Sequence, residues 1–215
     1  YALGAGGAGS VFAARHDVLG RLVAVKVLRM PTPAAKTRLL REARAQAALN
    51  HPNIVTVHDV IEYGDDIAVI MDLVEGGDLA MWMLGKPAWA SRLAVFRQLL
   101  SGVAAAHRRG LVHRDLKPQN VMVDLSTGLP LARVADFGLV SVVDEVSPRL
   151  TYAGVVMGTP SYMAPEQMRD PTMVDERADI FALGCILYEL ACGRMAFPQT
   201  DIARVAVAPD TENYA

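Results

Sequence analysis

Two different spacings of hydrophobic residues divide the first third of the chain. Across residues 10–28, apolar and β-branched residues alternate with polar ones on both sides of a turn at residues 17–20, which predicts an antiparallel hairpin. Residues 34–49 follow a proline-rich break and place apolar residues at helical spacing, so we expect a helix there. Two short apolar runs, residues 54–58 and 67–73, flank a further turn. This part of the chain is therefore predicted to form a small sheet that carries one helix.

The rest of the chain is predicted to be mainly helical. Long helical patterns cover residues 93–109 and 180–191, and the second has Asp179 before it as a cap and Gly193 behind it as a stop. Residues 75–78 break the preceding pattern and mark a hinge. Between the two helices, residues 136–166 show little periodicity, over a stretch longer than the roughly 12 to 15 residues at which ordered loops become unusual. Loops of that length usually carry function.

Composition and charge limit the classes of function. The 215 residues exceed the common size of one domain but fall short of two, so one unit with two lobes is the simplest interpretation. With 52% hydrophobic and 20% charged residues the chain can bury a core, which excludes a disordered linker. A formal net charge of -2 provides no field that would hold a polyanion, so nucleic acid is not an expected partner.

The sequence also limits the compartment. Its first residues lack the charged and apolar regions of a signal peptide, and no run approaches about 18 apolar residues, so a membrane anchor would have to lie outside this segment. Cys185 and Cys192 fall in one predicted helix, where their Cα atoms would be about 10 Å apart and unable to form a disulfide. A reducing compartment is expected. We therefore predict the cytoplasm, or the cytoplasmic face of the membrane if an anchor exists elsewhere in the protein.

Glycines near the start of the chain form a phosphate-binding pattern. Gly4, Gly6 and Gly9 make the arrangement G-x-G-x-x-G, whose small residues let a turn approach phosphate oxygens closely. A dinucleotide-binding fold would need a strand before these glycines and a helix opening at the third, whereas a hairpin is predicted here. The context therefore favours a glycine-rich loop over a dinucleotide fold.

Lys26 is the first candidate partner of this loop. It lies on the second predicted strand of the hairpin, where its ammonium could reach nucleotide phosphates beneath the glycines, although a lone lysine there would ordinarily be solvated. Glu42 on the following helix could pair with Lys26 and orient it. In an arginine-rich helix, however, the same glutamate is ordinarily a surface partner for Arg38 or Arg41.

One part of the sequence carries most of the functional information. Residues 113–120 read His-Arg-Asp-Leu-Lys-Pro-Gln-Asn, residues 136–138 read Asp-Phe-Gly, and residues 164–166 read Ala-Pro-Glu. Together with the glycine loop and the run Val-Ala-Val that precedes Lys26, these motifs occur in the order found in the protein kinase superfamily, which the chain resembles up to about Phe197. The run Gly-Thr-Pro-Ser-Tyr-Met-Ala-Pro-Glu-Gln further resembles the bacterial, eukaryotic-like Ser/Thr protein kinases.

The resemblance implies an α+β fold with two lobes. A protein kinase catalytic domain would occupy residues 1–215, with an antiparallel-sheet N-lobe carrying one helix at 1–71, a hinge at 72–78 and a mainly helical, partial C-lobe at 79–215. Most of the family's first strand would lie upstream of this segment. Beyond the matched region the family continues with further helices, one of which carries an arginine that pairs with the residue matched by Glu166, so we expect Glu166 to be a buried carboxylate without its partner.

The resemblance also assigns roles in phosphoryl transfer, a reaction that needs reactants to be positioned and charge to be neutralised. Asp115 would orient the acceptor hydroxyl and take its proton. Lys117 resembles the Ser/Thr-kinase lysine that reaches the γ-phosphate, with Thr159 in contact with this pair. Asn120 and Asp136 would supply oxygen ligands to Mg²⁺, which prefers such ligands. The predicted catalytic set comprises Asp115, Lys117, Lys26 and Glu42.

A second group of positions matches the family's ATP-binding cleft. Met71 resembles the residue behind the adenine ring, the backbone of residues 72–74 its hydrogen-bonding hinge, and Asp78 the acid that contacts the ribose. The apolar residues that would sandwich the purine would each pass by composition as ordinary core. The whole predicted nucleotide site is Leu3, Gly4, Gly6, Gly9, Val11, Ala24, Lys26, Met71, Asp72, Val74, Asp78 and Met122.

Other matched positions have structural roles in the family. His113 and Phe137 resemble members of an internal hydrophobic stack, and Asp179 resembles an acid that anchors the backbone of the catalytic loop. Gln46 occupies a place in that stack that is usually apolar, which could loosen the helix that carries it.

The long aperiodic segment carries a predicted switch. Arg114, directly before Asp115, matches an arginine that senses phosphate on the activation loop. Thr151 lies where bacterial relatives autophosphorylate, with Ser147 and Ser141 as weaker candidates. A dimer would allow this reaction to occur in trans.

The predicted function is ATP-dependent phosphorylation of serine and threonine hydroxyls on protein substrates, with ATP and Mg²⁺ as cofactors. An ATP-binding pseudokinase or inactive fragment that acts as a scaffold is the alternative. A small-molecule kinase of the antibiotic phosphotransferase kind would have no reason to keep Lys117, Thr159 and the Ala-Pro-Glu motif.

Overall fold

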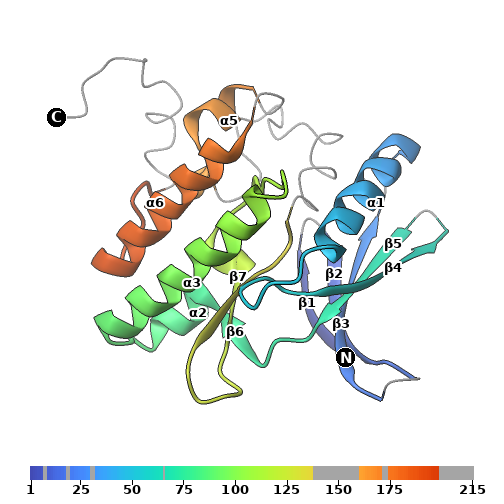
Figure 1. Cartoon of the computed structure of the whole chain (residues 1–215), viewed down its shortest axis with the longest axis horizontal. Coiled ribbons are helices and arrows are strands. Elements are labelled where there is room, and N and C mark those ends of the chain that lie inside the picture. The colour runs from blue at the N-terminus through green and yellow to red at the C-terminus, as the bar shows by residue number, and fades with distance from the viewer. Residues whose placement is uncertain are drawn as a thin grey trace.

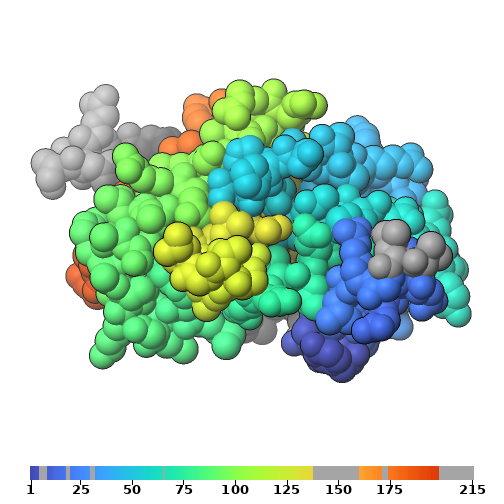
Figure 2. All heavy atoms as spheres, turned by 60° about the horizontal axis from the view of Figure 1, so that its bottom comes forward, coloured from blue at the N-terminus to red at the C-terminus, as the bar shows by residue number. Residues whose placement is uncertain are grey.

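A computed structural model describes residues 1–6, 9–17, 20–29, 32–64, 66–137, 160–170 and 174–198 (Figure 1). These residues form two lobes. The blue-to-turquoise residues of the sheet-rich lobe lie on one side of the space-filling view, and the green-to-red residues of the helical lobe lie on the other (Figure 2). Within the described residues, no helix is both long enough and apolar enough to cross a bilayer.

An antiparallel sheet forms the first lobe, and its strand order in the described residues is β1-β2-β3-β5-β4. Alternation along β5 is strict, because every second residue is buried. The strands are β1 (Ala2–Gly6), β2 (Gly9–Arg15), β3 (Leu22–Arg29), β4 (Val57–Tyr63) and β5 (Asp66–Asp72). The predicted hairpin is therefore present as β2 and β3, and β1 pairs with β2 at the edge of the sheet.

Helix α1 (Pro33–Ala47) covers one face of this sheet (Figure 1). Its start is set by Thr32, whose Oγ1 accepts a hydrogen bond from the backbone N–H of Ala35 at 3.2 Å. Leu39 and Ala43 are fully buried against the sheet. Burying a leucine in this way contributes about 1.5–3 kcal/mol to stability. The apolar residues whose spacing predicts the helix are therefore the ones that hold it against the sheet.

The second lobe contains a short antiparallel sheet and the helices that pack on it. Helices α3 and α6 lie side by side, and Ile186 of α6 belongs to the same core as Leu99 of α3 (Figure 1). The elements are β6 (Gly76–Asp78), α2 (Leu79–Leu84), α3 (Trp89–His107), the 3-10 turn η1 (Pro118–Asn120), β7 (Val121–Asp124), β8 (Leu131–Val134), the 3-10 turn η2 (Pro160–Tyr162), α5 (Pro165–Arg169) and α6 (Glu176–Cys192).

Two segments differ from the expected elements because they pair with distant parts of the chain. Of the apolar run at residues 54–58, only the last two residues belong to β4, whereas Val55 donates its backbone N–H to the carbonyl of Val134 in the second lobe at 2.9 Å. Residues 76–78 of the predicted hinge form β6, which pairs with β7. A Cβ at Gly76 would lie 2.0 Å from the carbonyl oxygen of Val123, so only glycine fits at this pairing.

Helix α6 begins earlier than predicted. Its N-cap is Asp175, whose carboxylate accepts from the backbone of Arg177 at 2.9 Å, and Asp179 lies inside the helix instead. The helix ends at Gly193, which adopts the left-handed conformation with φ 69°, as the sequence predicts. Cys185 and Cys192 are both free, as expected, although only Cys185 is buried.

Candidate functional site

Asp179 of α6 anchors the loop between α3 and η1. This carboxylate is 1% exposed and accepts hydrogen bonds from the backbone N–H of His113 at 2.8 Å and of Arg114 at 2.9 Å. Its Oδ2 also lies 2.7 Å from Nε2 of His107. Burial raises the pKa of Asp179, but the hydrogen bonds from His107 and the loop outweigh it, so the pKa falls below its ordinary value. The carboxylate therefore fixes Arg114, whose φ of 65° is unusual for a residue with a side chain.

Asp115 stands at the centre of this loop with two partners. Lys117 places its Nζ 2.8 Å from Oδ2 of Asp115. Asn120 donates its amide to the backbone carbonyl of Asp115 at 2.7 Å and to Oδ2 at 3.1 Å. Both bonds from Asn120 are donated by its NH₂ group, and together with Lys117 they hold the Asp115 carboxylate in place. A carboxylate positioned in this way can accept a proton from a nearby hydroxyl.

Lys26 and Asp136 meet where the two lobes face each other. Nζ of Lys26 on β3 lies 2.8 Å from Oδ2 of Asp136, and the lysine side chain is almost fully buried. Asp136 follows β8 with φ of 62°. The backbone N–H of Ala135 donates to the carbonyl of Asn120 at 2.9 Å, which places Asn120 beside Asp136. Four polar side chains that are distant in sequence therefore converge: Lys26, Asp115, Asn120 and Asp136.

Glu42 does not join this group. It is bonded to Nε of Arg38 at 3.3 Å, which is the ordinary surface pairing that the sequence also allowed, while Lys26 bonds to Asp136 instead. Burial raises the pKa of Glu42, and the charge and hydrogen bond of Arg38 offset only part of that rise. Its Oε2 is buried and has no hydrogen-bond partner among the described residues. The predicted pairing of Lys26 with Glu42 is therefore not formed in this structure.

Residues predicted to belong to the internal stack are buried in the structure. The rings of His113 and Phe137 lie 4.9 Å apart, and Nε2 of His113 is 2.8 Å from the carbonyl of Ala135. Gln46 of α1 is 1% exposed, and within the described part of the chain its Oε1 has no hydrogen-bond partner. A polar side chain thus sits in a buried position, as the resemblance predicts.

The apolar residues predicted to hold a purine gather in one cluster. Ala24 and Met71 are buried cross-strand partners on β3 and β5, and Val11, Val74 and Met122 pack against the same cluster. Met122 comes from the second lobe, so the cluster spans the junction. The carboxylate of Asp78 accepts from the backbone N–H of Met81 at 2.8 Å and caps α2.

The glycines of the predicted phosphate-binding pattern lie in the β1–β2 pair. Gly4 pairs with Val11, and Gly6 with Gly9, across β1 and β2. A Cβ at Gly9 would lie 2.2 Å from the carbonyl oxygen of Val27, so this position requires glycine. Leu3, the remaining residue of the predicted site, is partly exposed on β1. The β1–β2 pair therefore lies next to β3, the strand that carries Lys26.

The polar group fits a magnesium ion. Asp136 and Asn120 offer carboxylate and amide oxygens, and Asp115 lies beside them. Mg²⁺ is usually held by one or two carboxylates together with phosphate oxygens and water. Within the described residues no cluster of three or more His, Cys, Asp or Glu forms a protein-only metal site. The donors therefore suit an ion that arrives with phosphates.

The three residues of the predicted switch, Ser141, Ser147 and Thr151, lie outside the described residues, and so does Thr159, which was predicted to contact Asp115 and Lys117. Glu166 is described and is exposed, so the expected cost of burying it does not arise. Sequence reasoning missed Gln167, which is buried and donates its amide to the carbonyl of Arg114. Its place directly after the Ala-Pro-Glu motif was the available signal.

A second missed contact joins η2 to α6. The hydroxyl of Tyr162 donates to Oε2 of Glu189 at 2.5 Å, and burial together with this bond raises the pKa of Tyr162. Tyr162 and Gln167 line one pocket with Asp115 and Lys117. The pocket places η2 and α5 directly beside the loop that carries the candidate base.

Comparison with known proteins agrees with this geometry. A family model described as protein kinase domain matches residues 1–212. Serine/threonine-protein kinase Pkn1 of Myxococcus xanthus is 40% identical over 210 residues, which cover 96% of this chain and 30% of that protein. PrkC of Bacillus subtilis, also a serine/threonine-protein kinase, is 33% identical over 210 residues, covering 95% of this chain and 32% of its own length.

A solved structure shares the fold. The crystal structure of Rad53 residues 1–466 in complex with AMP-PNP superposes with a TM-score of 0.76 at 26% identity, over 95% of this chain and 51% of that one. The chain spans less than half the length of the curated relatives named above. The two-lobed α+β architecture, the order of the motifs and the match over residues 1–212 lead to one conclusion: the chain belongs to the protein kinase family.

Proposed function

We propose that the protein transfers the γ-phosphoryl group of ATP to serine and threonine hydroxyls of protein substrates. The observation that carries this proposal is the convergence of Lys26, Asp115, Asn120 and Asp136 at the junction of the lobes. Relatives that are serine/threonine-protein kinases, and the AMP-PNP complex of Rad53, support the choice of reaction and nucleotide.

In the proposed reaction, Asp115 accepts the proton of the acceptor hydroxyl. The hydroxyl oxygen forms a bond to the γ-phosphorus while the bond between that phosphorus and the β,γ-bridging oxygen breaks, which releases ADP. Lys117, already 2.8 Å from Asp115, lies where it can neutralise charge on the γ-phosphate. Bound Mg²⁺, held by Asp136 and Asn120, would neutralise further phosphate charge.

Lys26 has to change its partner in this proposal. Its ammonium is bound to Asp136, and nucleotide phosphates would compete for it. Release from Asp136 would free that carboxylate for Mg²⁺ and allow the pairing with Glu42 that the family resemblance implies. The purine would lie in the apolar cluster around Ala24, Met71 and Met122.

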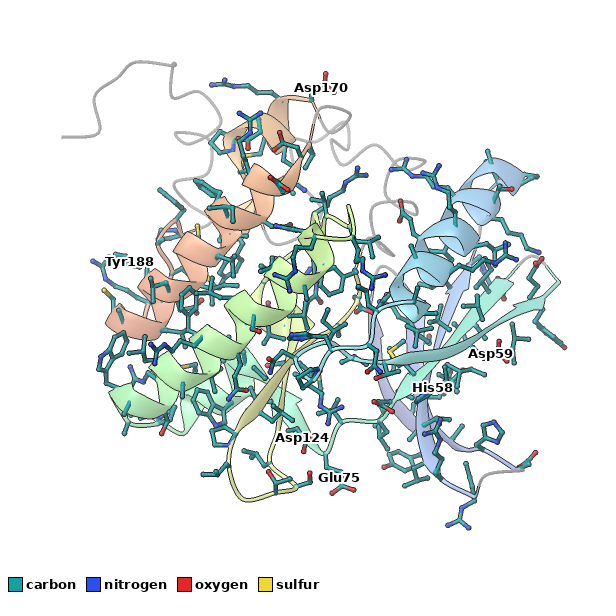
Figure 3. The ribbon with its side chains drawn as sticks, viewed as in Figure 1. His58, Asp59, Glu75, Asp124, Asp170 and Tyr188 are labelled. Carbon is teal, nitrogen blue, oxygen red and sulfur yellow. The ribbon has the colours of Figure 1, made fainter. Side chains whose placement is uncertain are left out.

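A transfer assay tests the proposal. Protein incubated with radiolabelled ATP, Mg²⁺ and a generic basic protein should label serine and threonine. Asp115→Asn should abolish transfer but keep nucleotide binding, because it removes the proton acceptor and not the cleft. Asp59→Asn is a matched control, because Asp59 is exposed on β4 and its carboxylate accepts a hydrogen bond from the backbone N–H of its neighbour Val60 (Figure 3). Binding without transfer in the unaltered protein would instead support a scaffold.

We also propose autophosphorylation of Thr151. A phosphate there would carry roughly two negative charges and could bind Arg114, whose buried Nε has no partner among the described residues. Mass spectrometry after incubation with ATP should find phosphate on the Thr151 peptide, with a rate that rises with protein concentration if a dimer reacts in trans. An unmodified Thr151 peptide in actively transferring protein would end this part of the proposal.

A further inference from the structure

A line of charged side chains crosses between the lobes behind the predicted hinge. Nε2 of His58 on β4 lies 2.7 Å from Oδ1 of Asp72 at the end of β5. Arg133 on β8 places Nη1 3.4 Å from Oδ2 of the same aspartate and Nη2 3.4 Å from Oδ2 of Asp124 on β7. His58 and Asp124, labelled in Figure 3, mark the two ends of this line, one in each lobe.

The position of Arg133 relates it to the proposed purine site. Arg133 is the cross-strand partner of Met122, so the two side chains share one face of the β7–β8 pair. The neighbouring residues on these strands alternate to the opposite face, where Val121, Ala132 and Val134 are fully buried in the second lobe. The face with Met122 and Arg133 is therefore the one turned toward the first lobe.

Asp72 is the residue through which this contact reaches the hinge. It closes β5, its backbone N–H donates to the carbonyl of Thr56 at 3.0 Å, and the following residues connect to β6. Its side chain contacts His58 of the first lobe and Arg133 of the second, while its backbone begins the segment proposed to bind adenine. A displacement of Asp72 would therefore displace that segment relative to Met122.

The charges make this link more than an ordinary surface ion pair. An exposed pair contributes about 0–1 kcal/mol, but these side chains are only 11–28% exposed and one guanidinium serves two carboxylates. Burial raises the pKa of Asp124, yet hydrogen bonds from Ser126 and the charge of Arg133 lower it below the ordinary value. Without Arg133, Asp72 and Asp124 would lose the guanidinium that joins them across the lobes.

We propose that Arg133 is a positioning residue that braces the hinge segment over Met122 and thereby sets the affinity for the nucleotide. This inference rests on the proposed function, because it assumes that adenine lies between the hinge backbone and Met122. Arg133 touches neither the phosphates nor the acceptor in this arrangement, so it should affect binding and leave the chemical step unchanged.

Steady-state kinetics and hydrogen–deuterium exchange test the brace. Arg133→Met, which keeps an unbranched apolar stem but removes the guanidinium and its charge, should raise the KM for ATP and the Kd for AMP-PNP by about threefold to tenfold, with kcat changed by less than about twofold. Without nucleotide, amides of residues 72–78 should exchange faster, while those of α3 should not change. Arg177→Met is the matched control, because it removes an exposed arginine that pairs with Asp175 far from the hinge.

Further variants keep the test decisive. Asp124→Asn should also raise the KM for ATP and the exchange rate of residues 72–78, by less than Arg133→Met does. This variant replaces Arg133→Met in the test if Arg133→Met does not fold. In the double variant Arg133→Met with Asp72→Asn, KM should rise no further than in the worse single variant, because both act through one contact.

The outcomes separate this inference from the proposed function. Unchanged KM and unchanged hinge exchange in Arg133→Met would overturn the brace, as would faster hinge exchange with no change in KM. If the unaltered protein binds no nucleotide, the proposed function fails, and the role in nucleotide affinity fails with it. The exchange rates of residues 72–78 then decide separately whether Arg133 holds the hinge segment.

Discussion

Replacement of Asp179 by asparagine should uncouple the catalytic loop from α6. The carboxylate accepts from the backbone N–H groups of His113 and Arg114 and from His107, and it is fully enclosed. Asparagine keeps one accepting oxygen and brings an NH₂ group to the place of the other. Whichever way the amide is turned, at least one buried donor then meets a second donor.

The expected magnitude follows from this count. A hydrogen bond to a charged acceptor contributes about 1.5–3 kcal/mol, and breaking a buried charged contact costs about 3–5 kcal/mol. We therefore expect the free energy of unfolding to fall by about 3–5 kcal/mol in Asp179→Asn. Arg114, held at φ 65°, should relax and shift Asp115, and a misplacement of about 1 Å can lower kcat by roughly 100-fold.

Urea unfolding and kcat measure the two effects, and Asp175→Asn provides the matched control. Asp175 lies on the same helix but is exposed and caps its start, where asparagine caps as well. The control should therefore show little change in either quantity. Asp179→Asn with the stability and kcat of the unaltered protein would refute the role of this carboxylate as the anchor of the loop.

The Asp179 carboxylate should also make the free energy of unfolding depend on pH. Because the pKa of Asp179 is lowered in the folded protein, its contribution to stability is complete above the ordinary aspartate value of 3.8 and is lost as the pH falls through the folded pKa. The advantage of the unaltered protein over Asp179→Asn should therefore be constant near neutral pH. Urea titrations should show it shrinking below about pH 4.

Three further predictions concern α1 and the contact between α3 and the loop before β4. Gln46→Met should raise the free energy of unfolding by about 1–3 kcal/mol, because it removes a buried oxygen that has no partner among the described residues; a lower urea midpoint would contradict this. Gly102→Ala should lower it by about 1–3 kcal/mol, since the new Cβ would lie 2.5 Å from the carbonyl oxygen of Asn53, and unchanged stability would contradict that close approach. Glu42→Gln should raise the free energy of unfolding at neutral pH. Burial raises the pKa of Glu42, so the folded protein with Glu42 loses stability as the pH rises through that raised pKa and the carboxyl ionises. Urea titrations should show the difference between the two proteins vanishing below the ordinary glutamate pKa of 4.5.

Elements with a strong local pattern could be predicted from the sequence. The β2–β3 hairpin has apolar and β-branched residues on both sides of a turn, and α1, α3 and α6 have apolar residues at helical spacing. The short strands β6, β7 and β8 were not predicted, because three or four residues carry too little periodicity and their pairing is set by partners elsewhere in the chain. The same reason explains why Ile54 lies outside the named strands. Its apolar neighbours predict a strand, but its backbone pairs with Val134 in the other lobe.

The candidate site shows a similar division. Motif order placed Lys26, Asp115, Asn120 and Asp136 in one group, and the structure brings these side chains together. The partner of Glu42 could not be read from spacing, because Arg38 is always four residues away whereas contact with Lys26 depends on how α1 lies against the sheet. Asp179 was expected to cap α6 and also to anchor the loop, and only its contacts with the loop backbone are formed.

The bond between Val55 and Val134 has a mechanical consequence. The chain passes from one lobe to the other after Asp72, and residues 53–55 form a second crossing through backbone hydrogen bonds to β8. Two separate points of attachment define a line, so one lobe can swing about that line but cannot twist freely against the other. Opening for nucleotide exchange would then be a rotation of one lobe about this axis. The end of α1 nearest to residue 53 would move least, because it lies closest to the axis.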